Sequence, residues 1–350
     1  MADFGGWEMP IEYPASHGGG VINEHTAVRE RVGAFDVSHL GKAIVRGVGA
    51  RDYINSAVTN DLSKITPGQA QYTMLCDENS AGVIDDLIVY LRSDDDLLLI
   101  PNAANNAEVV DRLKKRAPSG ITITNAHTEF AVLAMQGPLA ESVLQSLGLP
   151  TALEYMSFTE ATLDGETIII CRTGYTGEKG FELLPSWSFA EKLWRRLVGE
   201  VESRGGLVAG LGARDTLRTE MCYPLHGHEL SLSITPVQAN ASWAVGWNKS
   251  EFWGATKLRE EKVAGPLRIM RPLLLQDRGI PRAEMKIVDA SGRDIGVVTS
   301  GTFSPTLKQG IALALLDSSI KIGDLVEIDV RGRLIKASVA KAPLVPSHVR

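Results

Sequence analysis

Two adjacent carboxylates, Asp85 and Asp86, lie within the otherwise apolar run VIDDLIVY at residues 83–90. Neighbouring side chains on a β-strand point to opposite faces, so one carboxylate faces a core or cleft while the other faces away. The same alternation places Asp86, Ile88 and Tyr90 on one face. The two acids are either a solvated pair at the mouth of a hairpin, or one of them is held in a partly apolar cleft that suits proton or cation chemistry.

A glycine-rich polar stretch, RTGYTGEKGFE, occupies residues 172–182. Its glycines allow the backbone to approach a ligand closely, and Tyr175 offers a stacking face and a hydroxyl. Glu182 enters an apolar strand, where burying a carboxylate is costly unless it is paired. Glu182 is therefore either an acid at a strand edge or the acceptor of two hydrogen bonds from an amidine-like N–C–NH₂ edge of a ligand. The glycine spacing is not GxGxxG, so it does not favour dinucleotide binding.

The segment GARDTLRTE, residues 212–220, places Arg214 and Arg218 four residues apart on one helix face. This pattern is typical of a solvated, salt-bridged helix, and it also suits an arginine that pairs with a carboxylate in a ligand or cleft. Further along, the sequence SWAVGW contains Trp243 and Trp247, which form either the walls of a cleft or part of the core.

Metal and redox sites are not predicted. His226 and His228, followed by Glu229, form an HxH pair on a loop, and such pairs are more often hydrogen-bonded or solvent-facing than metal-ligating. The three cysteines are far apart, odd in number and set in apolar contexts, which indicates buried thiols in a reducing cytoplasm rather than a disulfide framework. They are Cys76, Cys171 and Cys222.

Composition narrows the class further. The chain has 350 residues, with 36 Lys+Arg against 42 Asp+Glu and a formal net charge of −6, which argues against a nucleic-acid partner. No apolar stretch approaches the ~18–20 residues that span a bilayer. The first residues carry an acid, Asp3, and no basic region before an apolar run, so we expect no signal peptide. A cytoplasmic, multidomain protein is predicted, with no membrane contact.

The elements that position these residues alternate between helices and strands, but the strands come in hairpins. The runs at residues 71–78 and 83–92 predict one hairpin, and ATLDGETIIICR at residues 161–172 predicts another. This arrangement favours an α+β fold with antiparallel sheets. The first twenty residues are rich in proline and glycine and predict no regular element. Helices are expected at residues 23–31, 50–60, 104–116, 138–147, 189–204 and 212–221.

After Gly265 the helical patterns stop. Six short strand-like runs separated by glycine, aspartate and serine follow, a pattern typical of a small β-barrel or jelly-roll domain. We therefore expect a domain boundary near residues 254–268.

Taken together, eight motifs in order closely resemble the aminomethyltransferase (T-protein) family of the glycine cleavage system, over about residues 4–346. The motifs are FGGWEMP, FDVSHLGK, the hairpin QYTMLCDE…GVIDDLIVY, LAMQGP, RTGYTGEKGFE, LGARDTLRTE, SWAVGW and VTSGTFSPTL.

This resemblance implies three domains around a central cavity that binds tetrahydrofolate. Residues 1–258 would form two interleaved folate-binding α+β subdomains, roughly 1–48 with 135–255 and 49–134, and residues 265–346 a C-terminal β-barrel. The implied reaction takes an aminomethyl group from the lipoyl arm of H-protein, a transient partner. Tetrahydrofolate accepts the carbon, giving 5,10-methylenetetrahydrofolate, and ammonia is released. No metal is implied.

The family's essential aspartate falls on Asp86, where the resemblance implies orientation and charge stabilisation at the folate nitrogens, since the transferred carbon passes through an iminium-like cation. Proton abstraction by Asp86 is the other reading. The pterin-binding glutamate falls on Glu182 and the motif arginine on Arg214. Other positions that line the folate cavity in the family fall on Tyr72, Tyr90, Asn102, Tyr175 and Trp243.

Two alternatives belong to the same superfamily. A folate-dependent demethylase would share the fold and folate site but differ around the donor pocket. A folate-binding scaffold or iron–sulfur assembly factor would be expected to lose the acid at Asp86 and to depend on a reactive cysteine. The sequence also departs from relatives near its end, where Val349 and Arg350 stand in place of an aromatic residue that often approaches the folate.

Overall fold

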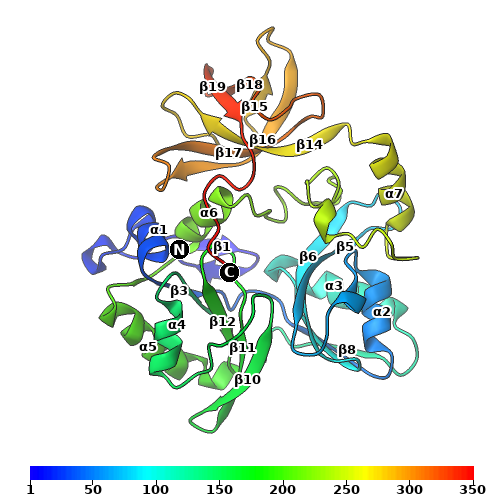
Figure 1. The fold of residues 1–350 in the computed structure, drawn as a ribbon, viewed down its shortest axis with the longest axis vertical. Coiled ribbons are helices and arrows are strands. Elements are labelled where there is room, and N and C mark those ends of the chain that lie inside the picture. Colours follow the sequence, from blue (N-terminus) through cyan, green and yellow to red (C-terminus); the bar gives the residue numbers. More distant parts are fainter. The chain divides into compact units, whose positions relative to one another are not determined.

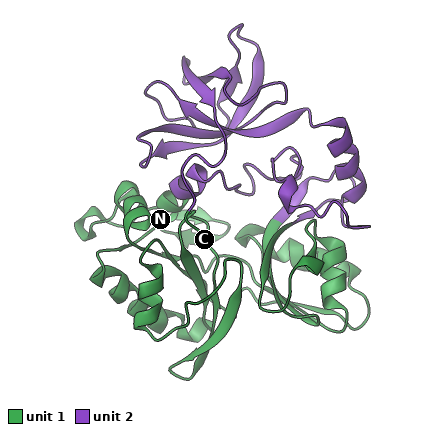
Figure 2. Ribbon diagram, in the orientation of Figure 1, with its two compact units in different colours: residues 1–73, 86–214, 348–350 green, residues 74–85, 215–347 purple.

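The computed structural model describes residues 1–350. The chain forms two compact units, coloured separately in Figure 2. Unit 1 contains residues 1–73, 86–214 and 348–350, and unit 2 contains residues 74–85 and 215–347. The segment 74–85 and the last three residues therefore each belong to a different unit from the chain that precedes them.

Unit 1 contains a six-stranded sheet with the order β10-β11-β12-β9-β3-β13, labelled in Figure 1. Neighbouring strands pair antiparallel, except that β13 lies parallel to β3. The predicted hairpin at residues 161–172 is confirmed as β10 and β11. The strands are β3 (Gly33–Asp36), β9 (Leu133–Gln136), β10 (Phe158–Leu163), β11 (Glu166–Cys171), β12 (Gly180–Leu184) and β13 (Leu207–Val208).

Helices cover this sheet with an apolar face. Helix α5 (Trp187–Ser203) buries Phe189, Leu193, Leu197 and Val201, which recur every four residues and so lie on one side of the helix. They join one core with side chains of α4 (Ala140–Ser146) and of strands β9, β11 and β12. Helix α1 (Val21–Glu30) lies close to β3 and β13.

A second, five-stranded sheet has the order β5-β6-β7-β4-β8. Strands β5 and β6 run from one unit into the other, and they form the hairpin predicted around the two adjacent acids. The strands are β4 (Ala43–Arg46), β5 (Ala70–Cys76), β6 (Val83–Ser93), β7 (Asp96–Ile100) and β8 (Thr122–Asn125), and the helices beside them are α2 (Ala50–Ala57) and α3 (Asn106–Arg116). The two sheets meet where Gln69, before β5, bridges to Ser157, before β10.

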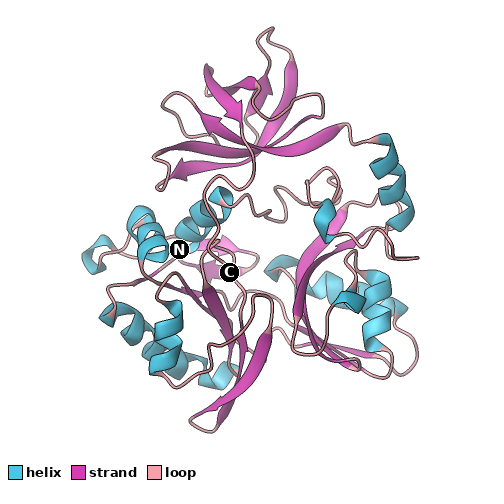
Figure 3. Ribbon diagram, viewed as in Figure 1, coloured by secondary structure: helices cyan, strands magenta, loops and turns pink.

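Unit 2 contains a closed barrel of six strands, in the order β14-β17-β16-β15-β18-β19, drawn as magenta arrows in Figure 3. The predicted C-terminal barrel is thus confirmed, and the mixed fold agrees with the predicted α+β class. The strands are β14 (Arg268–Leu275), β15 (Lys286–Val288), β16 (Asp294–Ser304), β17 (Gln309–Asp317), β18 (Leu325–Val330) and β19 (Arg333–Val339). Their inward side chains form a core of their own. No helix in the structure combines the length and the apolar character that crossing a membrane requires.

Two regions differ from the expectations or add to them. The first twenty residues are not free of regular structure, because Ala2–Phe4 (β1) and Trp7–Met9 (β2) form a hairpin that turns at Gly5 and Gly6, both with positive φ. Strands of three residues are too short to show an alternating pattern. The predicted boundary near residues 254–268 contains helix α7 (Ala255–Ala264), which ends at Gly265 with a φ of 79°.

The predicted helices are present with bounds shifted by a few residues, and α6 (Leu211–Glu220) is the one that carries the two arginines. Four short 3-10 turns complete the chain. They are η1 (Ala15–His17), η2 (Leu62–Lys64), η3 (Ala103–Asn105) and η4 (Ser242–Ala244).

Candidate functional site

Asp86 is held by donors from both strands that flank its own. Tyr72 of β5 donates its hydroxyl hydrogen to Oδ2 of Asp86 at 3.0 Å. Asn102, two residues beyond the end of β7, donates its amide hydrogens to Oδ1 at 2.9 Å and to the backbone oxygen of Asp86 at 3.1 Å. Asp85 points to the opposite face and is fully buried. The pair is therefore not a set of solvated acids, and three predicted site residues lie together.

Glu182 of β12 is buried, with 7% of its surface exposed. Thr173 donates its hydroxyl hydrogen to Oε2 of Glu182 at 2.5 Å, and the hydroxyl of Tyr90 lies 3.1 Å from that of Thr173. Burial raises the pKa of Glu182, and the hydrogen bond from Thr173 and the charge of Arg214 partly oppose that rise. Glu182 is thus a buried carboxylate, as one of the two sequence interpretations requires.

Strand β6 links the two carboxylates. Asp86 and Tyr90 lie four residues apart on this strand, a rise of roughly 13 Å, with side chains on the same face. Tyr90 is buried and leads through Thr173 to Glu182. Two acids far apart in sequence therefore mark two ends of one line of polar side chains within unit 1.

Arg214 and Tyr175 form a stacked pair in unit 1. The guanidinium carbon of Arg214, in the first turn of α6, lies 4.6 Å from the centre of the Tyr175 ring. Its positive charge helps lower the pKa values of Glu182 and His39. The arginine and the glycine-rich stretch that the sequence singled out separately are therefore in contact.

Arg218, four residues further along α6, has a different environment. It is 2% exposed and pairs with Asp215 at 2.6 Å and with Glu229 at 2.8 Å, and it donates to Ser300 of β16 at 2.8 Å. These contacts are all inside unit 2. The salt-bridged interpretation of the helix therefore describes Arg218, although the network is buried rather than solvated.

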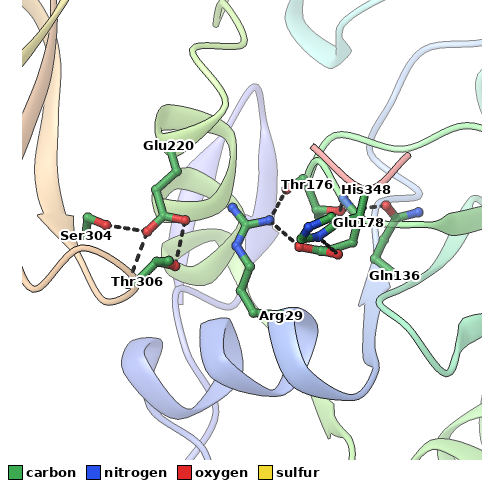
Figure 4. Close-up of polar contacts among 8 residues, drawn as sticks. All are labelled: Arg29, Gln136, Thr176, Glu178, Glu220, Ser304, Thr306 and His348. Atoms are coloured by element: carbon green, nitrogen blue, oxygen red, sulfur yellow. Dashed lines mark hydrogen bonds and ion pairs between the residues drawn. The ribbon is translucent and has the colours of Figure 1, made fainter. Parts of the chain in front are cut away.

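Glu220, at the end of α6, is fully buried and accepts hydrogen bonds from Ser304 and Thr306 of the barrel motif, as Figure 4 shows. Thr306 Oγ1 lies 2.9 Å from the carboxylate. The motifs LGARDTLRTE and VTSGTFSPTL thus contact each other within unit 2, and their polar residues attach the end of α6 to the barrel.

The glycine-rich stretch closes around the side chain of Gln136, the last residue of β9. Cβ atoms built on Gly174 and Gly180 would lie 2.1 and 2.3 Å from this side chain, so only glycine fits at either position. Gln136 donates to the backbone oxygen of Thr173 at 3.2 Å and accepts from Thr176 at 2.9 Å. These two glycines therefore make room for Gln136, which the expected approach to a ligand did not include.

His39, in the FDVSHLGK motif, is 2% exposed, and its Nδ1 has no hydrogen-bond partner. Burial, reinforced by the charges of Arg214 and Lys42, lowers its pKa to about 3. Lys42 is fully buried and donates to the backbone oxygens of Ser38 at 2.7 Å and His127 at 3.1 Å, and burial lowers its pKa to about 8. The motif thus places a neutral imidazole within the electrostatic reach of Arg214.

The histidine pair on the loop is hydrogen-bonded, as expected from its pattern. His226 Nε2 lies 3.2 Å from the backbone oxygen of Val83, and His228 Nδ1 lies 2.7 Å from that of Thr299. The neighbouring Glu229 is committed to Arg218.

The cysteines are free. Burial raises the pKa of each thiol, which makes them poor nucleophiles.

Trp243 is not brought to these residues by any contact described. It lies in η4 of unit 2 and is 69% exposed, so its place in the site stays a prediction. Trp247 donates its indole hydrogen to the backbone oxygen of Ser242 at 3.0 Å, and the Lys262 ammonium lies 3.9 Å from the centre of its ring.

Two antiparallel-sheet regions with interacting buried polar groups, followed by a closed six-stranded barrel, define a multidomain α+β protein. Residues 1–249 match the family described as the GCVT N-terminal domain. Residues 268–346 match the glycine cleavage T-protein C-terminal barrel domain. The chain belongs to the glycine cleavage T-protein family, whose members are aminomethyltransferases.

Individual relatives agree with this membership. A curated aminomethyltransferase from Parafrankia sp. (strain EAN1pec) is 58% identical over 349 residues, covering 100% of this chain and 94% of the relative. One from Mycobacterium tuberculosis (strain ATCC 25618 / H37Rv) is 53% identical over 352 residues, with the same coverage. The crystal structure of glycine cleavage system aminomethyltransferase T from Bartonella henselae has a TM-score of 0.92 and 35% identity, covering 99% of this chain and 94% of that one. The chain is an aminomethyltransferase of the glycine cleavage system.

Proposed function

We propose that this enzyme transfers the aminomethyl carbon from the lipoyl arm of H-protein to tetrahydrofolate. The products are 5,10-methylenetetrahydrofolate, ammonia and the reduced lipoyl arm. The observation that carries the proposal is the carboxylate of Asp86, which accepts hydrogen bonds on both oxygens from Tyr72 and Asn102.

Asp86 acts as a fixed negative charge. When the nitrogen leaves the transferred carbon, that carbon becomes an iminium-like cation, and a carboxylate already oriented towards it stabilises the charge without reorganising. The two donors hold the carboxylate from opposite neighbouring strands, so its direction is set before substrate binds. Charge stabilisation therefore explains this arrangement better than proton abstraction, which needs no such double anchoring.

Glu182 recognises the pterin ring of the folate. A pterin presents an N–C–NH₂ edge that donates two parallel hydrogen bonds, and a buried carboxylate is the acceptor that matches this edge. The raised pKa of Glu182 reflects its burial, so donors on a ligand replace the water that the carboxylate has lost. Arg214 and Tyr175 add a charged and an aromatic face beside it. Tyr90 supports Glu182 through Thr173, and we place Trp243 at the folate by family resemblance.

Tetrahydrofolate is a substrate in this proposal, and H-protein is a transient partner, because its lipoyl arm must leave after each transfer. We place the reaction in the cytoplasm, which agrees with three free cysteines. A folate-dependent demethylase of the same superfamily is the alternative. The two relatives with more than half of their residues identical to this chain are both aminomethyltransferases, which does not favour it.

The test is an assay with lipoylated H-protein that carries the aminomethyl group, tetrahydrofolate and the purified enzyme. We expect release of ammonia together with formation of 5,10-methylenetetrahydrofolate. A parallel reaction with methylated amine and sulfonium donors tests the demethylase alternative. Absence of ammonia with a donor that a known T-protein accepts, or folate methylation from the methylated donors, contradicts the proposal.

A further inference from the structure

Residues 348–350 belong to unit 1, although residues 215–347 before them belong to unit 2. Each of the three contacts unit 1. The backbone nitrogen of His348 donates to the oxygen of Gly177 at 2.7 Å. Arg172 donates to the backbone oxygen of Val349 at 2.7 Å, and the guanidinium of Arg350 lies 6.0 Å from the centre of the Tyr155 ring. The segment is therefore fixed along its whole length.

The strongest of these contacts is to Glu178, shown in Figure 4. The Glu178 side chain is 2% exposed, and each of its oxygens has a partner: Arg29 of α1 at 2.9 Å and Nδ1 of His348 at 3.0 Å. A carboxylate only accepts hydrogen bonds, so Nδ1 of His348 is the donor. Arg29 also donates to the backbone oxygen of Thr176 at 2.6 Å. A buried acid thus joins α1, the glycine-rich stretch and the 348–350 segment.

Arg172 reinforces the same connection. It is 4% exposed and donates to Gly180 at 3.1 Å as well as to Val349. One side chain therefore spans the glycine-rich stretch from its first residue towards its end and also holds the 348–350 segment. Gln136 fills the stretch from within, so its conformation is fixed both inside and outside.

The stretch so held carries Tyr175 and Thr173, which contact Arg214 and Glu182. We propose that residues 348–350 form a clasp that positions the glycine-rich stretch, residues 172–182, for folate binding, with His348 as a positioning residue. The inference rests on the proposed function for its ligand. A loop already held in its binding conformation loses less entropy when ligand binds, so the clasp raises affinity without touching the reacting atoms.

The clasp contributes little to the stability of the fold. The side chain of His348 is 61% exposed, so its removal leaves no cavity, and ion pairs at such exposure contribute little to folding. Its effect is therefore expected in ligand affinity and in local order, rather than in the midpoint of thermal unfolding.

The experiment compares His348→Ala and His348→Asn with the wild-type chain. Asparagine places an amide N–H close to the position of Nδ1 and so retains the bond to Glu178. We expect the Kd and KM for tetrahydrofolate to rise roughly 3- to 10-fold in His348→Ala, the effect of one lost hydrogen bond, with kcat within about twofold. His348→Asn should restore the Kd to within about twofold of wild type. His17→Ala, which removes an exposed histidine of η1, should change nothing.

Hydrogen exchange without ligand provides a second measurement. Amides of residues 172–182 should exchange faster in His348→Ala than in wild type, while those of β16 and β17 should not change. A Kd of His348→Ala within twofold of wild type, equal weakening by alanine and asparagine, or unchanged exchange overturns the clasp. Failure of the wild-type chain to bind tetrahydrofolate would instead count against the proposed function, because hydrogen exchange reports on the clasp without folate.

Discussion

Tyr72 donates its hydroxyl hydrogen to Oδ2 of Asp86 at 3.0 Å, from the strand next to the one that carries the acid. Asn102 reaches the other oxygen from the opposite neighbouring strand. The carboxylate is thus oriented by the sheet itself, because the register of three adjacent strands sets where both donors lie.

Replacing Tyr72 with phenylalanine removes one of these donors and little volume. A hydrogen bond to a charged group contributes roughly 1.5 kcal/mol or more, so we expect kcat to fall about tenfold while the Kd for tetrahydrofolate changes by less than about threefold. Tyr53→Phe is the matched control, because that hydroxyl bonds the backbone oxygen of Leu113 instead. Steady-state kinetics per folded molecule decide the matter, and equal loss in both variants would rule out a specific role for Tyr72.

Asp86→Asn keeps the shape of the side chain and removes its charge. Electrostatic groups aimed at a developing charge are typically worth about 10²- to 10³-fold in kcat, and we expect a loss of that size, with folate still bound. The measurements are ammonia release in single-turnover experiments and folate binding by calorimetry. Asp111→Asn, at an exposed position of α3, serves as the control. Turnover of Asp86→Asn near that of wild type would remove Asp86 from the catalytic role.

Glu182→Gln should separate stability from binding. Burial raises the pKa of Glu182 in the folded chain, so near pH 7 the ionised carboxylate opposes folding relative to the unfolded chain. Glutamine can still accept from Thr173 without that charge, and we expect the free energy of unfolding to stay the same or rise by roughly 1 kcal/mol.

Folate affinity should fall in the same variant, since the amide offers only one acceptor to the pterin edge. A loss of about 10-fold or more is expected, because hydrogen bonds to charged groups contribute roughly 1.5–3 kcal/mol. Urea unfolding and calorimetry provide the two numbers, and Glu30→Gln, at the exposed end of α1, is the control. A variant that is both less stable and unchanged in affinity would make Glu182 a structural residue.

The sequence predicted the site better where it depends on one strand than where it depends on distant contacts. Period-two alternation on β6 placed Asp86 and Tyr90 on one face and Asp85 on the other, because alternation is local. The role of Gln136 was missed, since its contacts with Thr173 and Thr176 lie 37 and 40 residues away in sequence. A polar residue at the end of the apolar strand LAMQ, directly before Gly137, was the available signal.

The fold shows the same division. Long periodic segments such as α5 and the barrel strands were identified, because burial requires a repeated apolar pattern. The β1–β2 hairpin and α7 were missed. The hairpin strands have three residues each, and α7 buries only Ala255 and Leu258, too few to show a period.

His39 makes the stability of the enzyme depend on pH. Its pKa is about 3 in the folded chain because of burial, whereas a histidine in the unfolded chain titrates near its ordinary value of 6.5. The unfolded chain therefore binds the proton first. The stabilisation from a neutral His39 is fully present above pH 6.5 and is lost progressively as the pH falls towards 3.

His39→Asn removes this titration and keeps a polar group close to the position of Nδ1. Between pH 6.5 and 4, the free energy of unfolding of the wild type should fall more steeply than that of the variant, by about 1.4 kcal/mol per pH unit. Urea unfolding at four pH values across this range measures the slopes. His17→Asn, at an exposed histidine, should keep the wild-type slope. Parallel curves for wild type and His39→Asn would show that His39 takes up a proton in the folded chain as readily as in the unfolded one, and that burial does not keep it neutral.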